Sequence, residues 1–445
     1  MIYKSIHFGH PELKHQAVDQ TLGFAATPQL ALTAHKAFGT YTRHAKWHIT
    51  IANSSILDNH GPLQPGIGNH AVDIGTIEDQ LPAGVNVLSV CHNLQSLSLI
   101  FTRYRRAPAL RSEAPPIPSC EIPIGQLACL PHLRHLSIFY EENGRGTRDA
   151  YPFLWPLISR LAQLESLHLK DTRLNNYFAE LVARQTGSLS GHNQAFKLAS
   201  LTLESSYRVY DDTLELGYAG SIASLHKDTL QRFSIISPNM ELSDLSTSLL
   251  QRRLAANSIA PNPGPNLNNL KSLSLTYLAS DDPSPLIGQK WTEVFTQYPN
   301  LVHLSIQPQH SRPNDLLYVL KNNASIDPTA CPSLQTFTFV APACTTAAQL
   351  LEPLVMVTSE VTIRRKNRTE LKLVTIVLQL KQGSVSGLET MAEWCRTGEF
   401  SRILLHWAKK VQVYIWSLEL RFRLQGTGDV IVRLRSGGVE LSFDE

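Results

Sequence analysis

The chain has 445 residues, of which 43% are hydrophobic and 17% charged, and its formal net charge at pH 7 is +3. The low charged share argues against extended disorder, and the near-neutral balance gives no large field that would draw the chain to nucleic acid or to a membrane. No apolar run approaches the roughly 18 residues of a membrane helix, and the first ten residues lack the apolar core of a secretion signal. We expect an intracellular protein, cytoplasmic and/or nuclear.

The first 43 residues hold several apolar positions and precede a strand. The positions are Pro11, Leu13, Val18, Leu22, Leu30, Leu32 and Phe38. The stretch Trp47–Ile51 then alternates apolar and polar residues, which predicts the first strand of the domain that follows.

A recurring Leu-x-x-Leu-x-Leu unit dominates the middle of the chain. Its spacing averages about 34 residues, which is typical of a strand-plus-helix repeat. A weaker copy opens at Leu371. The clear copies open at Leu94, Leu133, Leu164, Leu198, Leu230, Leu270, Leu301 and Leu334.

Each unit predicts a half-buried strand, and the segments between units carry apolar residues at helical spacing. A strand, a helix and a further strand in recurring order favour right-handed crossovers and a parallel sheet. We therefore expect residues 44–340 to form an α/β solenoid with a parallel concave sheet and convex helices. The expected helices are Tyr151–Gln163, Tyr177–Gln185, Thr213–Lys227, Leu242–Ala256, Gln289–Tyr298 and Asp315–Asn322.

Short introductory tetrapeptides precede several units, among them Leu130-Pro131-His132-Leu133 and Cys331-Pro332-Ser333-Leu334. With them, the repeat resembles the leucine-rich repeats of F-box proteins, which form a ribonuclease-inhibitor-like superhelix. The pattern of Pro11 to Phe38 resembles an F-box, whose apolar helical face binds a Skp-type adaptor. This resemblance implies a helical segment over residues 1–43. The resemblance implies that Pro11, Leu13, Val18, Leu22, Leu30, Leu32 and Phe38 are adaptor-binding residues. The alternative is a helical cap that packs only on the first repeat.

The C-terminal residues, 341–445, predict irregular last repeats and a β-rich cap. Val411–Phe443 alternates apolar and polar residues in three or four runs, and two glycine-containing segments, Gln425–Gly428 and Ser436–Gly438, supply turns. This pattern indicates an antiparallel meander. Such a meander would cover the last exposed hydrophobic face of the solenoid.

The motifs of enzymes and of metal sites are missing from the sequence. It contains no Gly-x-Ser-x-Gly, no Gly-x-x-x-x-Gly-Lys and no His-Glu-x-x-His, and its six cysteines form no Cys-x-x-Cys pair. We expect reduced thiols, no cofactor, no metal and no catalytic residues. A GTPase-activating role for an inserted arginine, Arg103 or Arg173, is a remote alternative.

The expected partner is a protein client on the concave face of the sheet, with no nucleic acid and no membrane. Residues between the buried leucines would line that face, which is mostly neutral hydroxyls, and tyrosines after the strands would line its rim. The candidate face residues are Ile100, His135, Phe139, His168, Arg232, Ile236, His303 and Val340; the candidate rim residues are Tyr104, Tyr140, Tyr207 and Tyr277.

From the resemblance, we expect the substrate-recognition subunit of a Skp-cullin-F-box ubiquitin ligase. The alternative is a stand-alone leucine-rich-repeat scaffold whose F-box is decayed or absent. Neither would have a catalytic residue, since a substrate-recognition subunit acts by raising the effective concentration of its client at the ligase.

Overall fold

A computed structural model shows the architecture of the chain. It describes the residues 5–8, 23–26, 42–52, 88–89, 91–104, 130–142, 158, 161, 163–172, 197–205, 219–241, 267–278, 298–309, 333–340, 373–380, 417–424, 428–435 and 438–444. The chain divides into two compact units, Met1–Ser200 and Leu201–Glu445.

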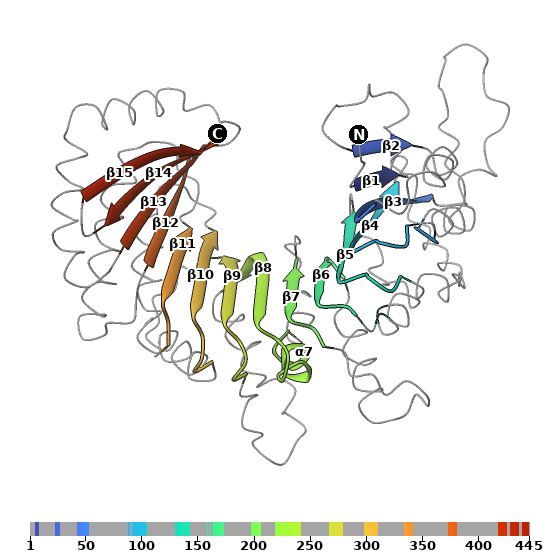
Figure 1. The fold of residues 1–445 in the computed structure, drawn as a ribbon, viewed down its shortest axis with the longest axis horizontal. Coiled ribbons are helices and arrows are strands. Elements are labelled where there is room, and N and C mark those ends of the chain that lie inside the picture. The colour runs from blue at the N-terminus through green and yellow to red at the C-terminus, as the bar shows by residue number, and fades with distance from the viewer. Residues whose placement is uncertain are drawn as a thin grey trace, which may run out of the picture. The chain divides into compact units, whose positions relative to one another are not determined.

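The first unit contains a parallel sheet of β-strands, seen in blue and cyan to green in Figure 1. β1 (Ser5–Phe8) lies between β2 (Gly23–Ala26) and β3 (His44–Ala52), parallel to both. The sheet continues from β3 in chain order, again with parallel pairing. These further strands are β4 (Ser96–Tyr104), β5 (His135–Glu142) and β6 (Ser166–Lys170).

The second unit repeats this arrangement. β7 (Ser200–Glu204) is followed by helix α7 (Ala219–Leu225) and by β8 (Arg232–Glu241). β8 and the next five strands lie side by side in chain order, all parallel (Figure 1). They are β9 (Ser272–Leu278), β10 (His303–Gln309), β11 (Thr336–Val340), β12 (Leu373–Leu380) and β13 (Ser417–Leu424).

The buried leucines of successive strands stand in register within each unit. In the first unit Leu97 pairs with Leu136, which pairs with Leu167, and each is at most 1% exposed. In the second unit Phe233, Leu273 and Leu304 align in the same way and are equally buried. Within each unit, the repeats therefore share an interior column, in which equivalent positions of neighbouring strands are buried side by side.

The entry to each strand also repeats. The amide of Leu94 donates to the carbonyl of Cys91 in a tight turn, and the same turn precedes Leu133, Leu164, Leu270 and Leu301. One carbonyl then accepts hydrogen bonds from two successive amides of the next strand: Arg43 accepts from Gln95 and Ser96 at 2.8 and 3.0 Å. The same fork recurs at the carbonyls of Gln95, Arg134, Glu165, Gln231, Lys271 and Val302. The turn fixes where each strand begins, and so fixes its register.

The helical prediction for residues 1–43 is wrong for the ten residues of this segment that the structure describes. Ser5–Phe8 and Gly23–Ala26 are strands, and Thr42 and Arg43 lie in neither a helix nor a strand. Polar and apolar residues alternate in Ser5–Phe8, which favours a strand, whereas the helical prediction depended on the F-box resemblance of positions 11 to 38. Trp47–Ile51 does lie in a strand, but β1 and β2 extend the sheet beyond it. The candidate adaptor-binding residues, Pro11, Leu13, Val18, Leu22, Leu30, Leu32 and Phe38, lie outside the described residues.

The repeat extends further in both directions than the leucine pattern indicated. Ala45 and Trp47 pair with Leu97 and Leu99, so Thr42-x-x-Ala45-x-Trp47 is a unit without leucine. The weaker copy at Leu371 supplies β12, since Val374 and Ile376 pair with Phe337 and Phe339. β13 adds one more parallel strand, because its Leu418 and Leu420 pair with Val374 and Ile376.

The antiparallel meander predicted at the C-terminus is present. β13 pairs antiparallel with β14 (Gly428–Arg435), and β14 pairs antiparallel with β15 (Gly438–Asp444). Among the expected helices, α7 lies inside Thr213–Lys227, of which residues 213–218 lie outside the described residues. The other five expected helical segments lie wholly or mostly outside the described residues.

Candidate functional site

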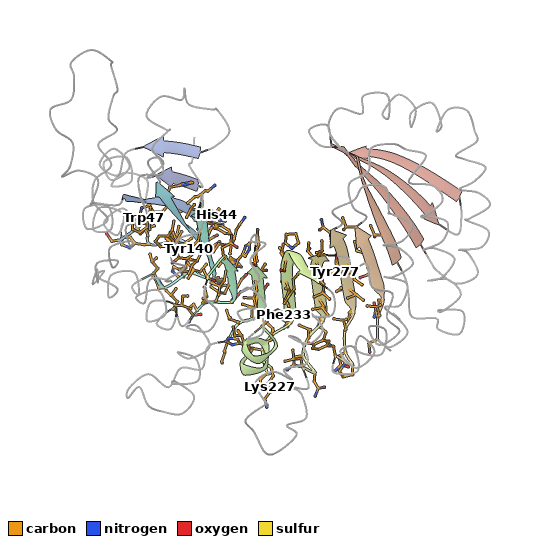
Figure 2. All side chains as sticks on the ribbon, turned by 180° about the vertical axis from the view of Figure 1, so that it is seen from behind. His44, Trp47, Tyr140, Lys227, Phe233 and Tyr277 are labelled. Atoms are coloured by element: carbon orange, nitrogen blue, oxygen red, sulfur yellow. The ribbon has the colours of Figure 1, made fainter. Side chains whose placement is uncertain are left out.

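Four strands of the first unit, β3 to β6, expose a polar face opposite their buried leucines. On β3, Ala45 and Trp47 are buried, while His44 is exposed and Lys46 and His48 are partly exposed. Figure 2 labels His44 and Trp47 on this strand. Because successive side chains of a strand point to opposite sides, the same alternation assigns three outward positions to each of the four strands. These twelve positions are called the first-unit face below.

The twelve positions align into three rows across the sheet. The first row is His44, Ser96, His135 and Ser166. The second row is Lys46, Ser98, Ser137 and His168, and the third is His48, Ile100, Phe139 and Lys170. Every row carries two basic or imidazole side chains, and no row carries a carboxylate. The charged groups of these three rows are therefore all basic, whereas the leucine units alone predicted a neutral hydroxyl surface.

Four of these basic residues, His44, Lys46, His48 and Lys170, were not among the candidate face residues. The first three lie on β3, whose unit has Thr42, Ala45 and Trp47 at the leucine positions, so the leucine pattern does not reach it. The alternation in Trp47–Ile51 was the available signal, since a strand with buried Trp47 and Ile49 must turn His48 outward.

Of the expected face residues in this unit, three lie on the surface and one does not. His135 is exposed, and Phe139 and His168 are half-buried, with their rings edge to face at a centroid distance of 4.9 Å. Ile100 was expected in an exposed apolar row but is only 2% exposed. It lies in register between His48 and Phe139, and such larger neighbours can cover an aliphatic side chain.

The corresponding positions of the second unit form a face of different chemistry. Four hydroxyl residues align across β8 to β11: Ser234, Ser274, Ser305 and Thr338. The row before them is Arg232, Ser272, His303 and Thr336, in which His303 Nδ1 and Thr336 Oγ1 share a hydrogen bond. Arg232 and His303 are exposed, and Ile236 and Val340 are half-buried, so these four expected face residues do reach the surface.

The expected tyrosine rim is wrong at Tyr277, which is completely buried. Tyr277 lies two and four residues beyond Leu275 and Leu273, so strand alternation points it into the interior rather than to the rim. Tyr140 is half-buried and stacks on the buried Phe101, with ring centroids 5.1 Å apart. Both tyrosines are labelled in Figure 2. Tyr104 ends β4 and its side chain is outside the described set, as is all of Tyr207.

Three buried titratable groups have displaced pKa values. Burial raises the pKa of the Cys91 thiol from 9.0 to about 11, although a hydrogen bond with Thr42 lowers it in part. Burial also raises the pKa of Tyr277 and of Tyr298. A thiol that keeps its proton at neutral pH is a poor nucleophile, so Cys91 has the properties of a structural side chain.

The described residues contain neither a candidate metal site nor a candidate membrane helix. Within the described ranges, no group of three or more His, Cys, Asp or Glu side chains could hold a metal ion. Over the same residues, no helix is long and apolar enough to cross a membrane.

In the comparisons with known proteins, no family model matches the chain. No curated protein matches it either.

Proposed function

We propose that this chain is a leucine-rich-repeat solenoid that binds a protein client on its polar sheet faces. The observation that carries the proposal is the register of outward side chains over several parallel strands, such as Ser234, Ser274 and Ser305. Aligned rows give a partner a continuous surface of donors and acceptors, which suits recognition by hydrogen bonds and shape. The spacing of the leucine units and the repeated strand-entry turn support the assignment of the repeat class.

The more specific function we propose is substrate recognition in a Skp-cullin-F-box ubiquitin ligase. Its support is the sequence resemblance of residues 11 to 38 to an F-box, placed ahead of leucine-rich repeats. In this role the repeats hold the client and the N-terminal segment holds the adaptor. The client is then modified because it is kept close to the ligase, and the chain itself performs no chemistry.

A stand-alone scaffold is the second candidate, and one observation favours it. β1 and β2 pair with β3 in parallel, so part of the N-terminal segment belongs to the repeat sheet. A segment that extends the sheet protects the edge of β3 and needs no adaptor to explain it.

Binding to a purified Skp-type adaptor separates the two candidates. The ligase proposal predicts that the full chain retains the adaptor in a pull-down and that Leu32→Asp with Phe38→Asp abolishes retention, because a charge removes an apolar anchor. The matched control is Gln231→Glu with Asn268→Asp, which adds two acids at exposed positions of the second unit and should leave retention unchanged. Circular dichroism checks that each variant is folded. If the wild-type chain does not bind the adaptor, the ligase proposal is overturned and the scaffold remains.

A further inference from the structure

We propose that the first-unit face binds an acidic, extended segment of a partner protein, whose carboxylates are held by the basic side chains of β3 and β6. This inference deepens the proposed function and rests on it, because it states the chemistry of the client. It concerns one unit only, since all twelve positions lie between His44 and Lys170.

The charge pattern supports this choice of ligand. β3 contributes His44, Lys46 and His48 along its outward side, and β6 contributes His168 and Lys170. β4 and β5 lie between them and contribute the hydroxyls of Ser96, Ser98 and Ser137, with His135 at the start of β5. Two basic strands separated by two strands that carry mainly hydroxyls create a positive potential with two centres, which is complementary to a chain with separated carboxylates.

The sheet geometry sets the spacing of those carboxylates. Neighbouring strands lie about 4.8 Å apart, so β3 and β6 are about 14 Å apart across three spacings. An extended peptide advances about 3.3 Å per residue, so about four residues span this distance. The segment that fits best therefore carries acidic residues about four positions apart, with hydrogen-bonding residues between them to meet Ser98 and Ser137.

The described carboxylates that border the face lie at the two ends of β6 and near the end of β5. Glu165 precedes the first row and forms an ion pair with Arg134 at 3.3 Å. Asp171 follows Lys170 and has a left-handed backbone, with φ of 54°. On β5, Glu141 follows Phe139 in the same alternation and is in register with Thr102 of β4. None of the three occupies one of the twelve positions, so the centre of the face is basic.

The same observations disfavour a nucleic acid. Affinity for a polyphosphate grows with the number of Lys and Arg contacts, and this face offers two lysines and no arginine. Single-stranded nucleic acids also need open aromatic rings for base stacking, whereas the only aromatic ring of the face other than imidazole, Phe139, already contacts His168. A protein segment with a few carboxylates needs neither feature.

The test measures binding of peptide probes to the full chain by fluorescence anisotropy. The first probe is a labelled glycine-serine peptide with glutamate at every fourth position, and the second has glutamine in place of glutamate. We expect the glutamate peptide to bind more tightly, and Lys46→Glu with Lys170→Glu to weaken its binding by about tenfold or more, because two attractions become repulsions. Lys46→Gln with Lys170→Gln is the milder pair and should give a smaller loss.

The matched control reverses two lysines away from the face. Lys227 and Lys271 are exposed residues of the second unit that precede β8 and β9. Lys227→Glu with Lys271→Glu makes the same change in net charge and should alter binding by less than about twofold, because neither lysine belongs to the first-unit face and exposed charges are screened by salt. An equal loss in both charge-reversed variants would mean that net charge alone attracts the peptide, and it would overturn the inference.

The remaining outcomes distinguish this inference from the proposed function. A chain that binds the Skp-type adaptor but binds both peptides equally overturns the inference alone. A chain that binds the glutamate peptide but not the adaptor overturns the ligase proposal alone. Single-stranded DNA that binds more tightly than the glutamate peptide, and is released by Lys46→Glu with Lys170→Glu, would assign the face to nucleic acid and overturn the inference.

Discussion

The two units use the same strand geometry and present different surfaces. Leu97, Leu136 and Leu167 in the first unit and Phe233, Leu273 and Leu304 in the second are interior residues in the same register. The outward rows differ, with two lysines and four histidines on the first-unit face and mainly hydroxyls across β8 to β11. The comparison teaches that burial constrains one side of each strand, while the other side is free to set the chemistry of a partner.

The largest expected effect tests whether the two interiors are equivalent. Leu167→Ala in the first unit and Leu273→Ala in the second should each lower the free energy of unfolding by about 2–5 kcal/mol, because each leaves a cavity among completely buried side chains. Urea denaturation followed by tryptophan fluorescence measures the loss. The controls, Ser166→Ala and Ser272→Ala, change outward positions and should stay within about 0.5 kcal/mol. A loss of less than about 1 kcal/mol for one leucine only would break the equivalence.

Alkaline pH should lower the stability of the two units through different buried groups, a thiol in the first unit and two phenols in the second. The pKa of Cys91 in the first unit is raised from 9.0 to about 11, and burial raises the pKa of Tyr277 and Tyr298 in the second. The unfolded chain releases these protons at lower pH than the folded chain, so stability is full below about pH 9 and falls as the pH rises toward 11. Urea midpoints measured from pH 8 to pH 11 follow the decline.

Single substitutions assign this decline to each unit. Cys91→Ala should remove the part that begins near pH 9, and Tyr277→Phe should reduce the part that begins near pH 10, because neither replacement ionises. Tyr140→Phe is the control with a half-buried ring. A wild-type urea midpoint that stays constant from pH 8 to pH 11 would contradict the expected role of these groups.

A smaller effect is expected in the turns that precede the strands. In the second unit Asn269 Nδ2 donates to the carbonyl of Asp228 at 2.9 Å, and Asn300 Nδ2 donates to that of Asn268 at 2.8 Å. These bonds join each turn to the turn of the preceding repeat, so Asn269→Ala or Asn300→Ala should cost about 0.5–1.5 kcal/mol. Thermal unfolding measures the change.

The first-unit control for the asparagine variants is His132→Ala. His132 stands directly before Leu133, as Asn269 stands before Leu270, and its side chain is exposed. It should change stability by less than about 0.5 kcal/mol. A cost for His132→Ala as large as that for Asn269→Ala would show that the position stabilises the turn regardless of the amide.

Much of the strand architecture could be predicted from the leucine spacing. Each clear unit supplied a strand, because three buried positions at fixed spacing leave a strand one way to face the core. The repeat that contains β3 was not predicted from leucine spacing, because Thr42, Ala45 and Trp47 replace its leucines while keeping the burial pattern. β1 was not predicted either, because the alternation of Ser5–Phe8 is only four residues long and the F-box resemblance of residues 11 to 38 implied helices.

The candidate surface was predicted less well than the fold. Outward positions such as His135 and His168 follow from strand alternation, but exposure depends on neighbours across the sheet. Ile100 lies between His48 and Phe139 and is buried, and Tyr277 continues the inward side of a strand longer than expected. The basic character of the first-unit face depends on the alignment of residues that are far apart in the sequence.

The sequence by itself determined most of the interior residues of the repeats, since apolar side chains at the two-residue period of a strand must leave water together. It also determined the order of the parallel strands that the leucine units supply within each unit, because each repeat is too short to pack anywhere except on its neighbours. Only the tertiary structure decided the surface. The combination of His44, Lys46, His135, His168 and Lys170 on one face depends on the register between β3, β4, β5 and β6, which hydrogen bonds between strands fix and spacing along the chain does not.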